Sequence, residues 1–216
     1  MKTRAKSVKV VSVGMLLLVA VGMLLLVAGC TLPTMNLKHE ASIASTYPDK
    51  GGLVVERFFD NRPEDEKRHA QKIEGQLTPQ IWSGETSPEV LTFLKKVIEV
   101  EAKRTRLFSD GQGDFVMSGK VSSLKVDRTC TVFRYIFSFF DFPTVRATVV
   151  YDVSLAKKGE TVFTKRISHI KSTTYWSQKE LALTLSRISD ISSGVLDEAI
   201  TESIKLLFDE IAKQVK

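Results

Sequence analysis

Residues 144 to 156 alternate between apolar and polar side chains, and this pattern constrains the fold more than any other part of the chain. The apolar residues are Val145, Ala147, Val149, Tyr151, Val153 and Leu155. Successive side chains of a β-strand point to opposite faces of the sheet, so the alternation predicts a strand with one buried face and one solvated face. The buried face must be covered by a second layer of secondary structure.

Four further segments are predicted to be strands, namely residues 53–59, 114–128, 131–140 and 161–171. They either alternate with a period of two or form short apolar runs bounded by turn formers. The Lys-Lys-Gly-Glu sequence of residues 157–160 predicts a tight reversal between two strands. After the first strand, Pro63 and the charged residues 64–68 predict a solvated loop, and residues 69–86 predict an irregular connection.

Apolar residues with helical spacing occur in two regions. The first helix is predicted from about Thr86 to about Phe108. The second region contains a short helix over residues 181–188 and a longer helix that begins near Gly194. Each region starts with a pair of residues at capping-box spacing, which are Thr86 with Glu89 and Ser177 with Glu180.

The order of these elements is strand, helix, several antiparallel strands and helix, which predicts an α+β fold. We expect a two-layer sandwich with two principal helices on one face of a mainly antiparallel sheet, because each layer then buries the apolar face of the other. Residues 51–216 are enough for one domain with a substantial core.

Residues 1–29 have the pattern of a signal peptide for export. The basic head contains Lys2, Arg4, Lys6 and Lys9. A long apolar run follows and ends at Val27, Ala28, Gly29 and Cys30. The small side chains of Ala28 and Gly29 leave room for a peptidase to reach the bond before Cys30, so the mature chain is predicted to begin there.

The apolar run is longer than an ordinary signal core because residues 13–20 are repeated without change at 21–28. Its length leaves an alternative open, since residues 10–29 could cross a bilayer as an uncleaved transmembrane helix. The intact mass of the membrane-extracted protein separates the two cases. An unprocessed Met1 terminus without added lipid would contradict cleavage before Cys30.

The tetrad that ends at Cys30 resembles the lipobox of bacterial lipoproteins, with Val27 where Leu is usual. This resemblance implies that Cys30 carries fatty acyl chains such as palmitate, which anchor the chain in a membrane. Thr31 stands where an Asp would imply retention in the inner membrane, so the resemblance implies the outer membrane, with the domain facing the periplasm. Residues 31–50 have no sustained period, and we expect Cys30 and this segment to form a lipidated tether over residues 30–50.

Charge and cysteine content narrow the classes of function. The leader holds four of the 31 basic residues and none of the 25 acidic ones, so the remaining chain has 27 against 25 and a net charge of +2. Proteins that bind nucleic acid usually have a strongly basic surface, which a net charge of +2 does not indicate. We therefore exclude nucleic acid as a partner. Cys130 is the one cysteine besides Cys30, and it is expected to be a small half-buried residue without chemistry.

The sequence shows no catalytic constellation, and we expect a protein that is not an enzyme. The three histidines His39, His69 and His169 lack the spacing of a metal site, so neither a metal nor a cofactor other than the lipid is expected. The alternative is a periplasmic hydrolase of envelope polymers that would use carboxylates of the loop 60–66. Two of these carboxylates converging in a cleft, with one shielded from water, would favour it.

The segment from residue 132 to 142 is unusually aromatic. As a strand it would place Phe133, Tyr135, Phe137 and Phe139 on one face. These rings would belong to a central strand covered on both sides, or they would contact a lipid, a membrane or a protein partner. The second interpretation follows from the fold, because a two-layer sandwich covers one sheet face only.

The chain as a whole resembles small periplasmic lipoproteins of the transport-auxiliary and lipopolysaccharide-assembly type. The residues that carry the likeness are the anchor, Phe58 to Arg62, Asp114 to Lys120 and the terminal helix. The resemblance implies a non-catalytic accessory subunit of an envelope complex that assembles the envelope or moves lipid. A protein displayed on the outside, as an adhesin or immunity factor, is a third interpretation that the residues do not separate from this one.

Overall fold

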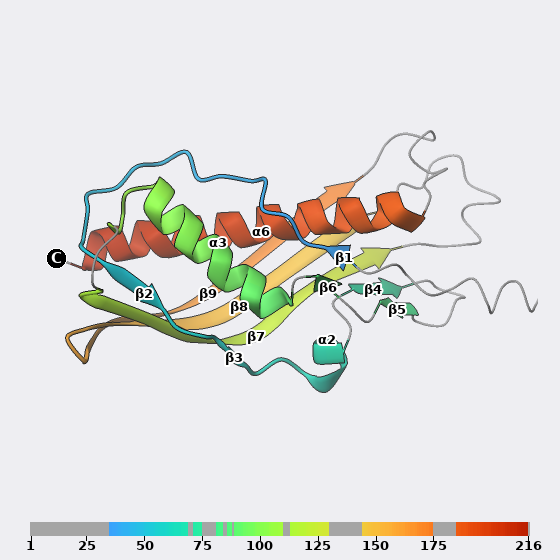
Figure 1. Cartoon of the computed structure of the whole chain (residues 1–216). Coiled ribbons are helices and arrows are strands. Elements are labelled where there is room, and N and C mark those ends of the chain that lie inside the picture. Colours follow the sequence, from blue (N-terminus) through green and yellow to red (C-terminus); the bar gives the residue numbers. More distant parts are fainter. Residues whose placement is uncertain are drawn as a thin grey trace, which may run out of the picture. The chain divides into compact units, whose positions relative to one another are not determined.

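The computed structural model describes residues 35–68, 71–74, 81–83, 86–87, 89–109, 113–129, 144–174 and 185–215. Three long strands form the main part of one sheet (Figure 1), namely β7 (Phe115–Thr129), β8 (Thr144–Lys157) and β9 (Glu160–Thr174). Both β7 with β8 and β8 with β9 are antiparallel. The predicted reversal between β8 and β9 is confirmed, because Lys158 and Gly159 have positive φ angles of 52° and 87°, as the tightest hairpin turn requires.

The other edge of β7 is lined by three short parallel strands in succession, which are β2 (Leu53–Val55), β3 (Phe59–Asp60) and β4 (Gln71–Glu74). The strand β5 (Ile81–Ser83) pairs antiparallel with β4. A separate parallel pair joins β1 (Met35–Asn36) to β6 (Thr86–Ser87). The predicted single strand over residues 53–59 is therefore two strands with a break between them.

Two long helices lie on one face of the sheet, as Figure 1 shows: α3 (Val90–Arg104) and α6 (Leu185–Gln214). The prediction of an α+β two-layer sandwich with a mainly antiparallel sheet is confirmed. A further described helix, α2 (Glu64–Arg68), is a single short turn beyond β3. Within the described part of the chain, no helix is long and apolar enough to cross a membrane.

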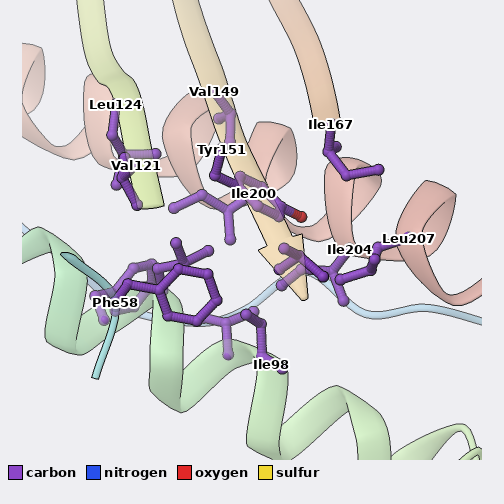
Figure 2. Close-up of a cluster of buried hydrophobic side chains, with 14 of the residues drawn as sticks. Phe58, Ile98, Val121, Leu124, Val149, Tyr151, Ile167, Ile200, Ile204 and Leu207 are labelled. Atoms are coloured by element: carbon purple, nitrogen blue, oxygen red, sulfur yellow. The ribbon is translucent and has the colours of Figure 1, made fainter. Parts of the chain in front are cut away.

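The core lies between the sheet and the two long helices. All six apolar residues of the alternating pattern in β8, from Val145 to Leu155, are 0 % exposed, as predicted. Figure 2 shows the centre of this core, to which Tyr151 of β8, Ile200 and Ile204 of α6, Ile98 of α3 and Phe58 from the link between β2 and β3 all belong.

A β-bulge in β7 explains why its sequence does not alternate regularly. The pairing with β8 shifts between Val121 and Ser123, so that Ser122 is one residue more than the partner strand needs. If residues 121–124 alternated regularly, without the bulge, Leu124 would point away from the helices, since a shift of one residue exchanges the two faces of a strand. With it, Val121 and Leu124 are both fully buried.

The predicted helix boundaries are wrong at three points. Helix α3 begins at Val90, with Glu89 as N-cap and no side-chain capping bond, because Thr86 forms a strand with β1 instead of a cap. It ends at Arg104, where the hydroxyl of Thr105 bonds back to a carbonyl of the last turn. The helix predicted from Gly194 begins at Leu185 and runs through that glycine.

The tether prediction is wrong for residues 35–50, which pack against the helix layer as an extended segment. Met35 is 0 % exposed, and Leu37 and Ile43 are each 5 % exposed. The backbone N–H groups of Tyr47 and Lys50 donate to carbonyls of the loop that follows α3. Tertiary contacts therefore order a segment that has no secondary-structure period of its own. We call residues 35–47 the N-terminal strap.

Candidate functional site

The residues that the sequence analysis singled out for lipidation and processing, Val27, Ala28, Gly29 and Cys30, lie outside the described residues. The same holds for the aromatic set Phe133, Tyr135, Phe137 and Phe139, for Cys130, and for the strand predicted over 131–140. Those predictions stay predictions. The structure instead shows where the residues next to these segments lie, such as Met35, Thr129 and Thr144.

The described residues that flank the aromatic segment, together with the last residue of β9, lie at one corner of the sheet. Thr129 pairs with Thr144, and Thr144 pairs with Thr174, whose hydroxyl lies 3.3 Å from that of Thr144. Residues 130–143 and 175–184 therefore connect at this corner. In Figure 1 the ends of β7 and β9, the beginning of α6 and β1 all lie toward the same end of the body.

The N-terminal strap is fixed close to this end. The hydroxyl of Ser193, in the first third of α6, donates a hydrogen bond of 2.6 Å to the backbone carbonyl of Asn36. Residue 35 follows Cys30 by only five positions. The strand β1 thus lies at the same end of the body as the ends of β7 and β9, and the β8–β9 turn lies at the other end of the sheet.

A buried cluster of charges holds the middle of the strap. The Nε2 atom of His39 lies 2.8 Å from Oε1 of Glu101 on α3, and its Nδ1 atom lies 2.8 Å from Oδ1 of Asp197 on α6. Arg104, one turn after Glu101, also lies 2.8 Å from Oε1 of Glu101. Glu101 is 0 % and Asp197 2 % exposed.

The remaining carboxylate oxygens of this cluster bind the backbone of the strap. The N–H groups of Glu40 and Ala41 donate to Oδ2 of Asp197, at 2.7 and 2.8 Å. The N–H group of Ile43 donates to Oε2 of Glu101 at 2.9 Å. Each carboxylate thus fastens the strap by its backbone as well as by the imidazole ring, which satisfies polar groups that burial would otherwise destabilise.

The far end of the strap is fixed by a tyrosine. The hydroxyl of Tyr47 donates a hydrogen bond of 2.7 Å to Oδ1 of Asp209 on α6, and its ring lies edge-on to Phe208. Burial, followed by the hydrogen bond to Asp209, raises the pKa of Tyr47 to about 12. The phenol therefore stays a hydrogen-bond donor throughout the physiological range.

The sequence does not predict this cluster, because His39 falls within the predicted tether. A usable signal was present in the strap, since the buried residues Met35 and Leu37 stand on either side of the exposed Asn36, in the alternation typical of a half-buried extended segment. The two acids could not have been found by pattern. They come from helices that are far apart in the sequence, and only the packing of α3 against α6 brings them together.

The loop 60–66 meets half of the condition that would favour a hydrolase. Glu66 is buried, at 7 % exposure, but its Oε1 atom lies 3.5 Å from the ammonium group of Lys125. Asp60 accepts hydrogen bonds of 2.9 and 2.8 Å from the guanidinium of Arg62, which holds the pKa of Asp60 below its usual value. An ionised, ion-paired Asp60 is poorly suited to act as a general acid.

A hollow of about 330 Å³ lies between β2 and the second half of α3. Leu53, Val55, Ala102 and Phe108 supply its apolar lining, and Glu99, Lys103 and Ser109 supply its polar lining. It holds none of the carboxylates of the loop 60–66. Across the described ranges, no three His, Cys, Asp or Glu side chains are grouped so that they could hold a metal ion.

Comparison with known proteins supports the fold. No protein-family model matches the chain, and no curated protein matches it significantly. A solved protein from Xanthomonas campestris, of the DUF330 family, superposes with a TM-score of 0.53 at 10 % identity, covering 84 % of this chain and 96 % of that one. This likeness shows a shared fold at an identity too low to transfer a function.

Lipoproteins are also among the similar solved structures, at lower scores. A minor lipoprotein from Acinetobacter baumannii has a TM-score of 0.35 at 12 % identity, covering 68 % of this chain and 92 % of that one. Rare lipoprotein B from Shewanella oneidensis has the same TM-score at 9 % identity, covering 66 % of this chain and 93 % of that one. These scores are too low to show a shared fold.

Proposed function

We propose that this protein is a lipid-anchored, non-catalytic accessory subunit that binds within a cell-envelope complex for assembly or lipid transport. The observation that carries the proposal is the sequence from Val27 to Cys30 at the end of a basic and apolar leader. The acyl chains on Cys30 hold the domain at the membrane, and we place it at the outer membrane, facing the periplasm.

The arrangement of the body supports this proposal. The strap begins five residues after Cys30 and lies at the end of the body where residues 130–143 also connect. An anchor at Cys30 keeps this end near the lipid surface. We expect Phe133, Tyr135, Phe137 and Phe139 to contact a lipid or a membrane-bound partner, because large apolar rings contribute much of the energy of such binding.

The lipid anchor is tested by replacing each of the two cysteines in turn. Cells that express the wild-type chain, Cys30→Ser or Cys130→Ser are grown with a radioactive fatty acid. The intact masses of the purified proteins are then measured by mass spectrometry. We expect label and loss of residues 1–29 in the wild type and in Cys130→Ser, and no label in Cys30→Ser. Equal labelling of all three, or an intact Met1 terminus on the wild type, contradicts the proposal.

The accessory role is tested by photo-crosslinking in intact cells. A photoreactive amino acid at Phe137 is compared with one at Lys158, which lies in the turn at the opposite end of the sheet. We expect a defined envelope protein or a lipid to be captured from position 137 and not from position 158. Capture from neither position, with the protein correctly anchored, counts against the accessory role and leaves the anchor intact.

A further inference from the structure

The N-terminal strap is held on the helix layer by groups whose charges depend on protons. Both ring nitrogens of His39 face carboxylate oxygens at 2.8 Å. A neutral imidazole has a single N–H, so one of the two contacts would then set a lone pair against an oxygen. Both contacts are favourable only when the ring carries two protons.

Both carboxylates also accept hydrogen bonds from other groups around the histidine. Glu101 also accepts from Arg104 and from the backbone of Ile43, and Asp197 also accepts from two backbone N–H groups of the strap. Such donors favour the ionised form of a carboxylate. The geometry is therefore that of an imidazolium between two carboxylates.

The charges of the cluster balance in this state. From α3 come Glu101 and Arg104, from α6 comes Asp197, and from the strap comes His39, so two negative groups face two positive ones. Removing one proton from His39 leaves a net negative charge beside carboxylates that are almost completely buried. An uncompensated buried charge is strongly destabilising, and separation of the strap from the helices would relieve it.

We propose that the strap is a proton-operated latch, closed while His39 carries two protons and released when the ring loses one. The attachment is firm while both ring nitrogens donate to carboxylates, and it weakens when one of these protons is lost. Release would expose the apolar side chains of Met35, Leu37 and Ile43, which are otherwise buried.

A further consequence rests on the proposed lipid anchor, whereas the latch itself does not. The strap spans residues 35–47, directly after the anchor segment. Fully extended, a segment of this length would add roughly 40 Å to the connection between Cys30 and the body. Proton loss would therefore increase the distance over which the body can move from the membrane.

The test measures amide hydrogen exchange of the strap by mass spectrometry on the full-length protein in detergent. Exchange is followed at about pH 6 and about pH 9, on either side of the usual titration of histidine, and corrected for the intrinsic pH dependence of exchange. We expect strap peptides to lose protection by about tenfold or more between the two values, as loss of a charge-assisted contact implies. Peptides of β8 serve as the internal reference and should not change.

Three variants decide whether His39 is the cause. His39→Gln should show low strap protection at both pH values, whereas His39→Lys keeps a cation at pH 9 and should stay protected. His169→Gln is the matched control, because His169 bonds Glu202 on the exposed side of α6 and not the strap. Equal wild-type protection at both pH values, or a wild-type pH response in His39→Lys, would overturn the proposal.

Discussion

The ring of Phe58 lies edge-on against the ring of Tyr151, with centroids 6.2 Å apart and an angle of 88° between the planes. This contact depends on a glycine in the neighbouring strand. A Cβ atom added to Gly119 would come within 2.5 Å of the Phe58 ring and within 2.4 Å of the carbonyl oxygen of Asp152. The Phe58 ring packs so closely on β7 because position 119 has no side chain.

We therefore expect Gly119→Ala to destabilise the fold by about 1–3 kcal/mol, the usual range for overpacking a filled core. Urea unfolding followed by circular dichroism measures the change. The control is Gly194→Ala in the interior of α6, where an added Cβ meets no atom within 4 Å. That variant should be more stable by roughly 0.5–1 kcal/mol, since alanine favours the helix. Equal effects of the two substitutions would contradict the packing argument.

Tyr47 should make the protein less stable at alkaline pH. Its pKa is raised to about 12 in the folded state, first by burial and then by Asp209, while in the unfolded chain it keeps its usual value of 10.0. Above pH 10 the unfolded state loses this proton first, so the contribution of Tyr47 is complete below pH 10 and declines up to about pH 12.

The measurement is the free energy of unfolding of the wild type and of Tyr47→Phe between about pH 9 and about pH 11. The variant loses the hydrogen bond to Asp209, which costs about 0.5–1.5 kcal/mol near neutral pH, but its stability should fall less steeply as the pH rises. Parallel curves for the two proteins would show that Tyr47 does not titrate in this way.

Asp60 should contribute to stability on the acid side. The hydrogen bond from Arg62 is the main reason why the pKa of Asp60 lies below its usual value of 3.8. The contribution of this carboxylate is therefore complete above pH 3.8 and is lost as the pH falls through the lower folded-state value.

We expect Asp60→Asn to be less stable than the wild type at pH 6, and the difference to shrink toward about pH 3. Chemical unfolding of the two proteins at several pH values gives the difference in their free energies of unfolding at about pH 6 and its change toward lower pH. Asp152→Asn is a suitable control, because Asp152 faces Arg166 across 3.9 Å on an exposed surface, where an ion pair contributes little. A similar pH dependence in both variants would argue against a specific role of the Asp60–Arg62 pair.

The aromatic segment is tested by Phe137→Ser and Phe139→Ser. If these rings contact a lipid or a partner, the variants should unfold at the same urea concentration as the wild type and lose partner capture in a pull-down from solubilised membranes. Global unfolding of either variant would instead support a buried strand, because removing a core phenylalanine costs about 3–5 kcal/mol. Phe59→Ser is a useful control, since Phe59 is 68 % exposed on β3.

Local patterns predicted most of the fold. The alternation in β8, the turn at Gly159 and the spacing of apolar residues in α6 depend on neighbours within one element, and all three agree with the structure. Boundaries failed where a long-range contact overrode a local signal. Thr86 has the sequence of a helix cap, but its pairing with Met35 makes it part of a strand.

The sequence by itself determined the two-layer architecture and which face of each element is buried, because side-chain periodicity is a property of a single segment. It also contains the lipobox-like tetrad from which the proposed anchor follows. Only the tertiary structure decided where residues 35–47 lie and what His39 contacts. Glu101 and Asp197 are far from His39 along the chain, and their partnership exists only because two helices and an extended segment meet in one buried place.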